Sequence, residues 1–273
     1  MTDATFSLEG KVAVVTGALG LLGRHHCRAL ARAGAHVVVT DLDRGRCSSL
    51  AGELTRAHGP DACGLAADVT REESLEALRD AVLSRFGRVD VLVNNAAVNE
   101  KVEDTPAARE LLAFESYPVD LWDAAFRVNV TGTFLCCRVL GTEMARRGRG
   151  SVINIASTYG VVAPDQSLYR RSDGRQTFYK SAAYPATKAA VIALTRYLAA
   201  YWGRAGVRVN ALSPGGVENG QDDDFVARYA EKTPLGRMAR ASDYEGAIVF
   251  LAGEASGYMT GANLLVDGGF TAW

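Results

Sequence analysis

The chain has few of the features that serve secretion, metal binding or nucleic-acid binding. Its five cysteines, at positions 27, 47, 63, 136 and 137, include no C-x-x-C pair. This odd, scattered set argues against a disulfide framework or a zinc site and favours reduced thiols, so we expect no metal. The formal net charge is −1, without the basic excess typical of nucleic-acid binders.

Long apolar runs are also missing. The first residues, MTDATFSLEGK, have no apolar core of a signal peptide. The longest apolar stretches are far shorter than the roughly 18 residues that a transmembrane helix requires. We therefore expect a cytoplasmic protein with no membrane partner. A hydrophobic content of 48% argues against disorder, and 273 residues suit one large α/β domain.

What the chain does contain is an alternation of short β-branched runs with longer helical stretches. Strands are predicted at Lys11–Thr16, His36–Thr40, Ala62–Ala66, Val89–Val93, Ser151–Ile155, Val207–Leu212 and Asn263–Val266. Helices are predicted at Leu21–Ala33, Arg44–His58, Thr70–Phe86 (opened by a Thr70–Glu73 capping box), Leu121–Met144, Ala182–Tyr201 and Tyr244–Ala252. This order predicts one α/β domain over residues 1–273, with a seven-stranded parallel sheet and helices on both faces.

A glycine-rich turn, TGALGLLG at residues 16–23, separates the first strand from the first helix. Glycines let the backbone approach a pyrophosphate, and the helix N-terminus offers free N–H groups. Asp41 ends the second strand, where a carboxylate can bind both ribose hydroxyls and repel a 2′-phosphate. We therefore predict NAD rather than NADP, although Arg44 and Arg46 keep NADP open. The alternatives are a plain glycine turn and a turn-capping aspartate.

Tyr184 and Lys188 are spaced to share one face near the start of a helix. Pro185 between them is tolerated only in the first helical turn. A neighbouring ammonium favours the phenolate form of a tyrosine, which makes Tyr184 a candidate base. Ser157 follows the fifth strand, so its hydroxyl belongs at the sheet edge where ligands bind. A chance Y-x-x-x-K and a loop-capping serine are the competing interpretations.

Further motifs follow in order: Asp68-Val69, Asn94-Asn95-Ala96-Ala97, Asn129, Pro214-Gly215 and Asp267-Gly268-Gly269. Together with the residues above, they make the chain from Lys11 to Gly269 resemble the short-chain dehydrogenase/reductase family, which implies a Rossmann-like, doubly wound fold. The resemblance implies that Tyr184 is the general acid/base, that Lys188 holds the nicotinamide ribose, that Ser157 positions the substrate oxygen and that Asn129 anchors a proton relay. It also implies a homo-oligomer, a tetramer or a dimer.

The same resemblance implies a set of NAD-binding residues. They are Gly17, Leu19, Gly20, Leu21, Leu22, Gly23, Asp41, Leu42, Asp68, Val69, Asn94, Ala96, Tyr184, Lys188, Pro214, Gly215 and Val217. Three positions depart from the family pattern. Leu21 replaces the usual middle glycine, Ala97 replaces the glycine of N-N-A-G, and no Thr or Ser follows Pro214-Gly215.

Ser157 and Tyr184 lie 27 positions apart, about twice the usual gap in the resembled family. The surplus at 164–180 is net basic and predicts a loop near the active site. As a lid it would bind substrate through Arg170 and Arg171, beside the predicted substrate contacts Ser157 and Tyr159; as a plain loop it would be solvated or contact another subunit. Residues 157–164 (STYGVVAP), with this insertion behind them, also resemble a subgroup of sugar-modifying oxidoreductases of bacterial surface-glycan, flagellin and nonulosonic-acid pathways. Residues 216–233 are expected to be flexible, with Asp222–Asp224 as a solvated charge run.

The sequence therefore predicts an NAD-dependent oxidoreductase that interconverts a secondary alcohol and a ketone on a polar, sugar-like or anionic small molecule. Two alternatives stay open. One is an NADPH-dependent 3-ketoacyl carrier-protein reductase, against which Asp41 speaks. The other is a non-catalytic dinucleotide sensor or scaffold, which has no need of the combined serine, tyrosine, lysine and asparagine.

Overall fold

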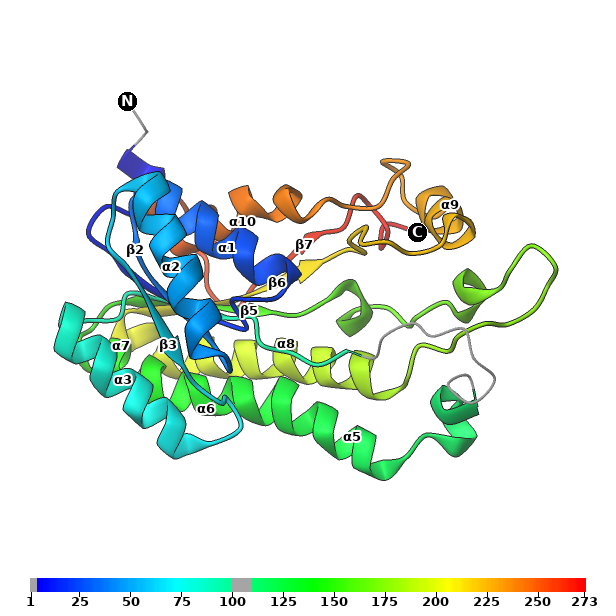
Figure 1. The fold of residues 1–273 in the computed structure, drawn as a ribbon, viewed down its shortest axis with the longest axis horizontal. Helices are drawn as coiled ribbons and strands as arrows, with labels where there is room; N and C mark the ends of the chain where they lie inside the picture. Colours follow the sequence, from blue (N-terminus) through cyan, green and yellow to red (C-terminus); the bar gives the residue numbers. More distant parts are fainter. Residues whose placement is uncertain (1–3, 100–109) are drawn as a thin grey trace.

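The computed structural model describes residues 4–99 and 110–273, and within them seven strands form one parallel sheet (Figure 1). The strand order β3-β2-β1-β4-β5-β6-β7 reverses direction between β1 and β4, which places a topological switch point at their carboxyl ends. This confirms the predicted seven-stranded, Rossmann-like sheet. The strands are β1 (Val12–Thr16), β2 (His36–Asp41), β3 (Ala62–Ala66), β4 (Val91–Asn94), β5 (Gly150–Ile155), β6 (Val207–Pro214) and β7 (Asn263–Val266).

Helices cover both faces of the sheet, as predicted (Figure 1). One face carries α1 (Leu21–Arg32), α2 (Arg44–His58) and α10 (Glu245–Ala252). The other carries α3 (Glu72–Phe86), α8 (Ala183–Trp202) and a long helix made of α5 (Val119–Phe126), α6 (Thr133–Cys136) and α7 (Thr142–Arg146). Two π-helical segments, Arg127–Gly132 and Cys137–Gly141, join the parts of the long helix.

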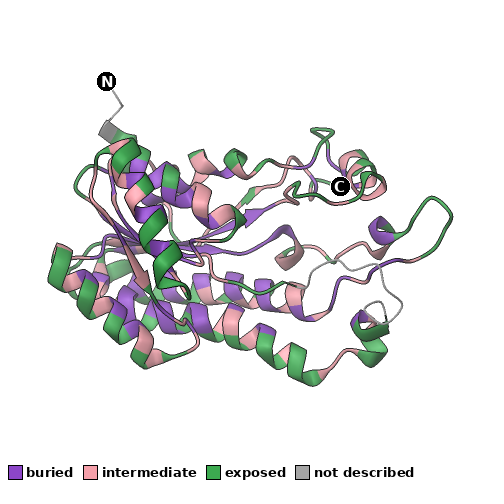
Figure 2. Cartoon of the chain, viewed as in Figure 1, coloured by how far each residue is buried: buried purple, intermediate pink, exposed green. Residues whose placement is uncertain are grey.

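The core consists of two apolar layers, one on each face of the sheet. In β1, Val12 and Val14 pack in the layer under α3 and α8, whereas Ala13 and Val15 pack in the layer under α1, α2 and α10. This alternation follows from the two-residue period of a strand. Figure 2 shows the buried residues along the sheet and the inward helix faces. The five cysteines, all within the described residues, are buried free thiols.

One local expectation was wrong, and a second region contains a helix that the sequence did not predict. The Thr70–Glu73 capping box does not form, because Arg71 occupies the N-cap of α3 without a side-chain bond, and the Thr70 hydroxyl donates to Asp68 Oδ1 at 2.7 Å. The stretch 216–233, expected to be flexible, contains the helix α9 (Asp223–Glu231). Asp222 caps this helix by accepting a hydrogen bond from the Phe225 N–H at 2.9 Å, so part of the acidic run starts a helix.

Beyond the carboxyl edge of the sheet, the chain forms a third apolar cluster. Leu168, Tyr169, Phe178, Tyr229 and Phe270 belong to it. The inserted segment 164–180 contributes to this cluster and has its own structure, a 3-10 turn at Gln166–Tyr169 and a bridge between residues 170 and 176. In Figure 1 its tip projects beside α9.

The stretch 99–118, between β4 and α5, is only partly covered by the structure, because residues 100–109 lie outside the described residues. A short 3-10 turn at Phe114–Ser116 precedes α5. Across residues 4–99 and 110–273, no helix combines the length and apolar character needed to cross a membrane.

Candidate active site

A cavity of about 700 Å³ follows the carboxyl edge of the sheet and collects most of the predicted site residues. Its middle contains Ser157, Tyr184, Lys188, Pro214, Gly215 and Val217. One end, named here the turn end, is lined by Gly17, Gly20, Leu21, Leu22, Asp41, Leu42, Asp68, Val69, Asn95 and Ala96. The other, named here the aromatic end, is lined by Tyr159, Tyr169, Phe178, Lys180, Phe225, Tyr229 and Met238.

The turn end depends on positions where no side chain fits. Gly17 has a φ of +60°, and a Cβ there would lie 2.6 Å from the Ala96 Cα. A Cβ on Gly23 would lie 2.3 Å from the Gly17 carbonyl oxygen. These close approaches let α1 begin directly against the end of β1, so that its first N–H groups face the cavity side of the turn.

Asn95 fastens this turn to the neighbouring strand. Its Nδ2 donates to the Thr16 carbonyl at 3.1 Å and to the Gly17 carbonyl at 2.8 Å. Sequence reasoning selected Asn94, the last residue of β4, and missed Asn95, which follows it. The Asn94 side chain is buried and donates to Asn154 Oδ1 at 2.8 Å and to Cys137 Sγ at 3.2 Å, so it points into the core and does not line the cavity.

Two backbone N–H groups fix the carboxylate of Asp41 at the turn end. Oδ2 accepts from the Leu19 N–H at 3.0 Å, and Oδ1 accepts from the Leu42 N–H at 2.8 Å. Leu19 and Gly23 therefore shape the turn without lining the cavity. The glycine cradle and the acidic side chain at the end of β2 suit a dinucleotide with free ribose hydroxyls. Among the described residues, no group of three or more His, Cys, Asp or Glu side chains is arranged to hold a metal ion.

Ser157, Tyr184 and Lys188 meet in the middle of the cavity. Tyr184 lies in the first turn of α8, where Pro185 is tolerated, and Lys188 follows one turn later. Lys188 Nζ donates to the Ile155 carbonyl at 2.8 Å and lies 5.7 Å from the centroid of the Tyr184 ring. Ser157 Oγ accepts from the Tyr159 N–H at 3.2 Å, which fixes the hydroxyl at the end of β5.

The surroundings of Lys188 lower its pKa but leave the side chain mostly charged at neutral pH. Burial, and secondarily the charge of Lys180, lower the Lys188 pKa to about 8. The ammonium therefore persists at pH 7 and is lost as the pH rises through about 8. A cation beside a phenol favours the phenolate, so this arrangement can support proton transfer by Tyr184.

Asn129 lies behind this group, buried in the π-helical segment of the long helix. Its Oδ1 accepts from the Val98 N–H at 2.8 Å, and its Nδ2 donates to the Val98 carbonyl and to Thr187 Oγ1, both at 3.1 Å. Thr187 Oγ1 donates in turn to the Tyr184 carbonyl at 2.8 Å. Asn129 thus connects the segment after β4 with the first turns of α8, although it does not line the cavity.

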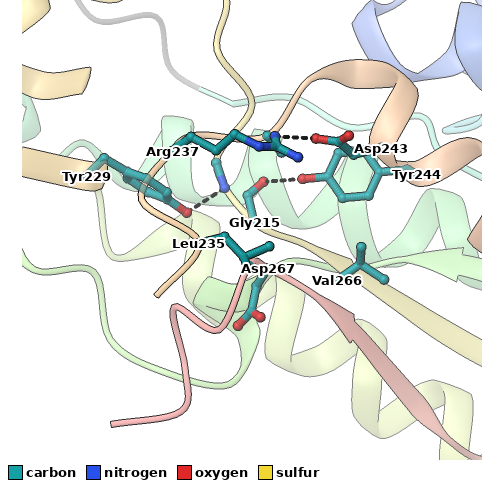
Figure 3. Close-up of a pocket in the computed structure, with 11 residues that line it drawn as sticks. Gly215, Tyr229, Leu235, Arg237, Asp243, Tyr244, Val266 and Asp267 are labelled. Carbon is teal, nitrogen blue, oxygen red and sulfur yellow. Dashed lines mark hydrogen bonds and ion pairs between the residues drawn. The ribbon is translucent and has the colours of Figure 1, made fainter. Parts of the chain in front are cut away.

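The turn after β6 is held from two sides (Figure 3). The Tyr244 hydroxyl donates to the Gly215 carbonyl at 3.1 Å, and the Gly216 N–H donates to the Tyr229 hydroxyl oxygen. Behind the turn lies a second cavity of about 250 Å³, whose wall includes the ion pair of Arg237 and Asp243 at 2.6 Å. Tyr229 lines both cavities, and sequence reasoning missed it because α9 was not expected.

Three residues of the inserted segment 164–180 line the cavity: Tyr169, Phe178 and Lys180. Gln166 holds the backbone of Lys180 on both sides, donating to its carbonyl and accepting from its N–H, each at 2.9 Å. This anchor places Lys180 at the cavity wall. Of the predicted substrate contacts, Ser157 and Tyr159 line the cavity, whereas Arg170 and Arg171 are exposed and do not. The structure thus does not bring these two arginines to the site.

Comparisons with known proteins agree with this geometry. The family described as short chain dehydrogenase matches residues 11–227. D-threitol dehydrogenase of Mycolicibacterium smegmatis is 35% identical, covering 98% of this chain and 96% of its own. Cis-4-hydroxycyclohexanecarboxylate dehydrogenase of Sinomonas cyclohexanicum is 36% identical, covering 96% and 97%. The crystal structure of a gluconate 5-dehydrogenase from Burkholderia cenocepacia, in complex with NADP and tartrate, has a TM-score of 0.84 and 33% identity over 99% of this chain and 98% of that one.

Proposed function

The chain belongs to the short-chain dehydrogenase family and is an oxidoreductase acting on CH–OH groups; from this premise we propose that it uses NAD to interconvert a secondary alcohol and a ketone on a polar, sugar-like or anionic small molecule. The observation that carries the proposal is the meeting of Ser157, Tyr184 and Lys188 in a cavity that continues to a glycine turn and Asp41.

Tyr184 acts as the general acid/base. In the oxidation direction its phenolate accepts the proton of the substrate hydroxyl, which Ser157 holds in place. The Lys188 ammonium stabilises the phenolate form. A nicotinamide held near Gly215 and Val217 would supply the hydride acceptor for oxidation of the alcohol and the hydride donor for reduction of the ketone. Asn129, through Thr187, positions the first turn of α8, and we propose that it also anchors the relay by which Tyr184 exchanges its proton with solvent.

NAD would be held by the turn end, with Asp41 binding the adenosine ribose hydroxyls and Gly215 and Val217 near the nicotinamide. Asp41 favours NAD because a 2′-phosphate would meet its carboxylate. The relative crystallised with NADP and the exposed Arg44 and Arg46 make NADP the competing cofactor. Calorimetric titration with NADH and NADPH decides between them, and a preference for NADPH would contradict the proposal and favour a 3-ketoacyl carrier-protein reductase.

The substrate assignment rests on the aromatic end and on the relatives' names. Flat aromatic walls can stack against a sugar or a carbocycle, and the relatives are named for threitol and for 4-hydroxycyclohexanecarboxylate. The test is NADH formation with threitol, galactitol, sorbitol, gluconate and 4-hydroxycyclohexanecarboxylate. Turnover of at least one of them is expected. Dinucleotide binding without turnover across the panel would instead indicate a non-catalytic sensor or scaffold.

We also propose a homo-oligomer, a dimer or a tetramer. On α8, Tyr197 and Tyr201 stack at 6.0 Å and are 64% and 69% exposed, so two adjacent aromatic rings on the surface offer a contact for a second subunit. Light scattering coupled to size-exclusion chromatography is expected to give a multiple of 29.1 kDa. A mass of one chain would refute this assembly.

A further inference from the structure

Lys180 is the basic side chain that the inserted segment delivers to the aromatic end of the cavity. It is 7% exposed. Its Nζ lies 4.3 Å from the centroid of the Tyr184 ring, nearer than the Nζ of Lys188 at 5.7 Å. It also donates to Asn99 Oδ1, and Asn99 lines the same cavity. The ammonium is therefore placed beside the reacting tyrosine and not in open solvent.

The position of Lys180 is built into the fold. The two bonds from Gln166 fix its backbone, and the Gln176 side chain donates to the Gln166 carbonyl at 2.9 Å and to the Phe178 carbonyl at 2.7 Å. Phe178 is almost completely buried in the third apolar cluster. Because the backbone of Lys180 is fixed by Gln166 and its side chain is buried, this lysine has little conformational freedom to lose when it binds a ligand.

Among the described residues, the wall at this end of the cavity is mostly aromatic or apolar. Tyr169, Phe178, Tyr229 and Met238 line the same end of the cavity and are themselves buried. Apolar walls that exclude water lower the local dielectric constant. A fixed cation in such surroundings attracts an anion more strongly than a solvent-exposed lysine does. In the function proposed above, the hydroxyls of Ser157 and Tyr184 hold the reacting oxygen, so the Lys180 ammonium would contact a second group of the same small molecule.

Building on the function proposed above, we propose that Lys180 binds a carboxylate group of the substrate, so that the enzyme acts on hydroxy acids in preference to the corresponding neutral alcohols. Lys180 is then a specificity-determining residue, and the inserted segment serves to place it. The exposed arginines of that segment take no part in this contact.

The test measures binding of unreactive ligands, so it does not depend on turnover. Cyclohexanecarboxylate and cyclohexanecarboxamide are titrated separately into the enzyme in the presence of NADH. The wild-type enzyme is expected to bind the carboxylate about 10- to 100-fold more tightly, the contribution of a charge-assisted hydrogen bond. Lys180→Met, which keeps the side-chain length, abolishes this difference. Arg175→Met, which removes a charge from the exposed part of the same segment, retains it.

Kinetics separate substrate binding from an action through Tyr184. With 4-hydroxycyclohexanecarboxylate and its carboxamide as substrates, Lys180→Met is expected to raise KM about 10- to 100-fold for the acid only, with the pH profile of kcat unchanged. Equal binding of the two ligands to the wild-type enzyme, no detectable binding of either, or an equal loss of both in Lys180→Met overturns the proposal. Failure of the oxidoreductase assignment would look different, because the carboxylate would bind selectively and no alcohol would react.

Discussion

The two ends of the cavity are built by different means. The turn end is made of backbone: Gly17 approaches Ala96 so closely that no Cβ fits, and the surrounding residues continue hydrogen-bonded parallel strands. The aromatic end is made of side chains: Gln166 holds Lys180, and Tyr229 reaches from α9 to the turn after β6. At the turn end, a substitution disturbs the backbone and so the whole site. At the aromatic end, a single substitution can alter one contact and leave the rest of the wall in place.

This difference matches what each end is proposed to bind. NAD and NADP share the same pyrophosphate and nicotinamide, so a site fixed by backbone geometry can serve either cofactor. A substrate differs between enzymes, and loops beyond the sheet edge can vary without disturbing the core. Substitutions at the turn end should therefore change NAD binding, and substitutions at the aromatic end should change substrate binding. The predictions below test this division, beginning with the residue where the two ends meet.

Tyr184→Phe is expected to have the largest effect. Losing the general acid/base lowers kcat by about 100- to 10,000-fold. The ring still packs, so the dissociation constant of NAD is expected to stay within about twofold of the wild-type value, a change of about 0.4 kcal/mol in binding free energy. Stopped-flow absorbance gives the rate, and calorimetry gives the NAD affinity. Tyr197→Phe, an exposed position on the same helix, is the matched control. Full activity in Tyr184→Phe would refute the assigned role.

Gly17→Ala is expected to affect the turn end alone. The new Cβ meets the Ala96 backbone, and the φ of +60° is strained for alanine, so the turn shifts. Backbone strain of about 1–3 kcal/mol corresponds to a loss of roughly 5- to 150-fold in NAD affinity. Gly246→Ala is the control, since a Cβ there has open space. A rise in the substrate KM with normal NAD affinity would break the proposed division.

Sequence reasoning performed best where secondary structure determines position. The strand His36–Asp41 and the helix Arg44–His58 were predicted to within one residue, because a β-branched run and flanking glycines define them locally. The order of motifs then placed Ser157, Tyr184 and Lys188 at the carboxyl edge of the sheet, and the structure brings all three to one cavity.

The aromatic end could not be predicted in the same way, because its geometry depends on contacts between distant segments. Arg170 and Arg171 were selected by charge, yet the bridge between residues 170 and 176 turns that part of the segment toward solvent. Lys180 belongs to the same basic run, but only the bonds to Gln166 decide that it faces the cavity. Tyr229 depends on α9, whose N-cap was read as a solvated acidic run.

Gln166→Ala is expected to release the aromatic end while leaving the turn end intact. The variant removes both side-chain bonds to the Lys180 backbone. Two hydrogen bonds worth about 1 kcal/mol each allow the segment to move, which raises the substrate KM roughly 10-fold. The dissociation constant of NAD should not change. Ser172→Ala, at the exposed tip of the same segment, serves as the control, and an equal KM effect there would show that the anchor is unimportant.

Asp222→Ala is expected to give the smallest effect, and it tests whether α9 belongs to the aromatic end. The aspartate caps this helix through the Phe225 N–H, and losing an N-cap costs about 1 kcal/mol of helix stability. Fraying would loosen Phe225 and Tyr229, which line the cavity, so the substrate KM should rise about three- to fivefold, as a 1 kcal/mol loss implies. Hydrogen exchange should accelerate in residues 223–231 and not in α8. Asp223→Ala removes a neighbouring carboxylate that accepts no capping bond in the structure described here. If both variants behave alike, net charge and not the cap governs this helix, and the acidic run would act as the solvated surface that its sequence first suggested.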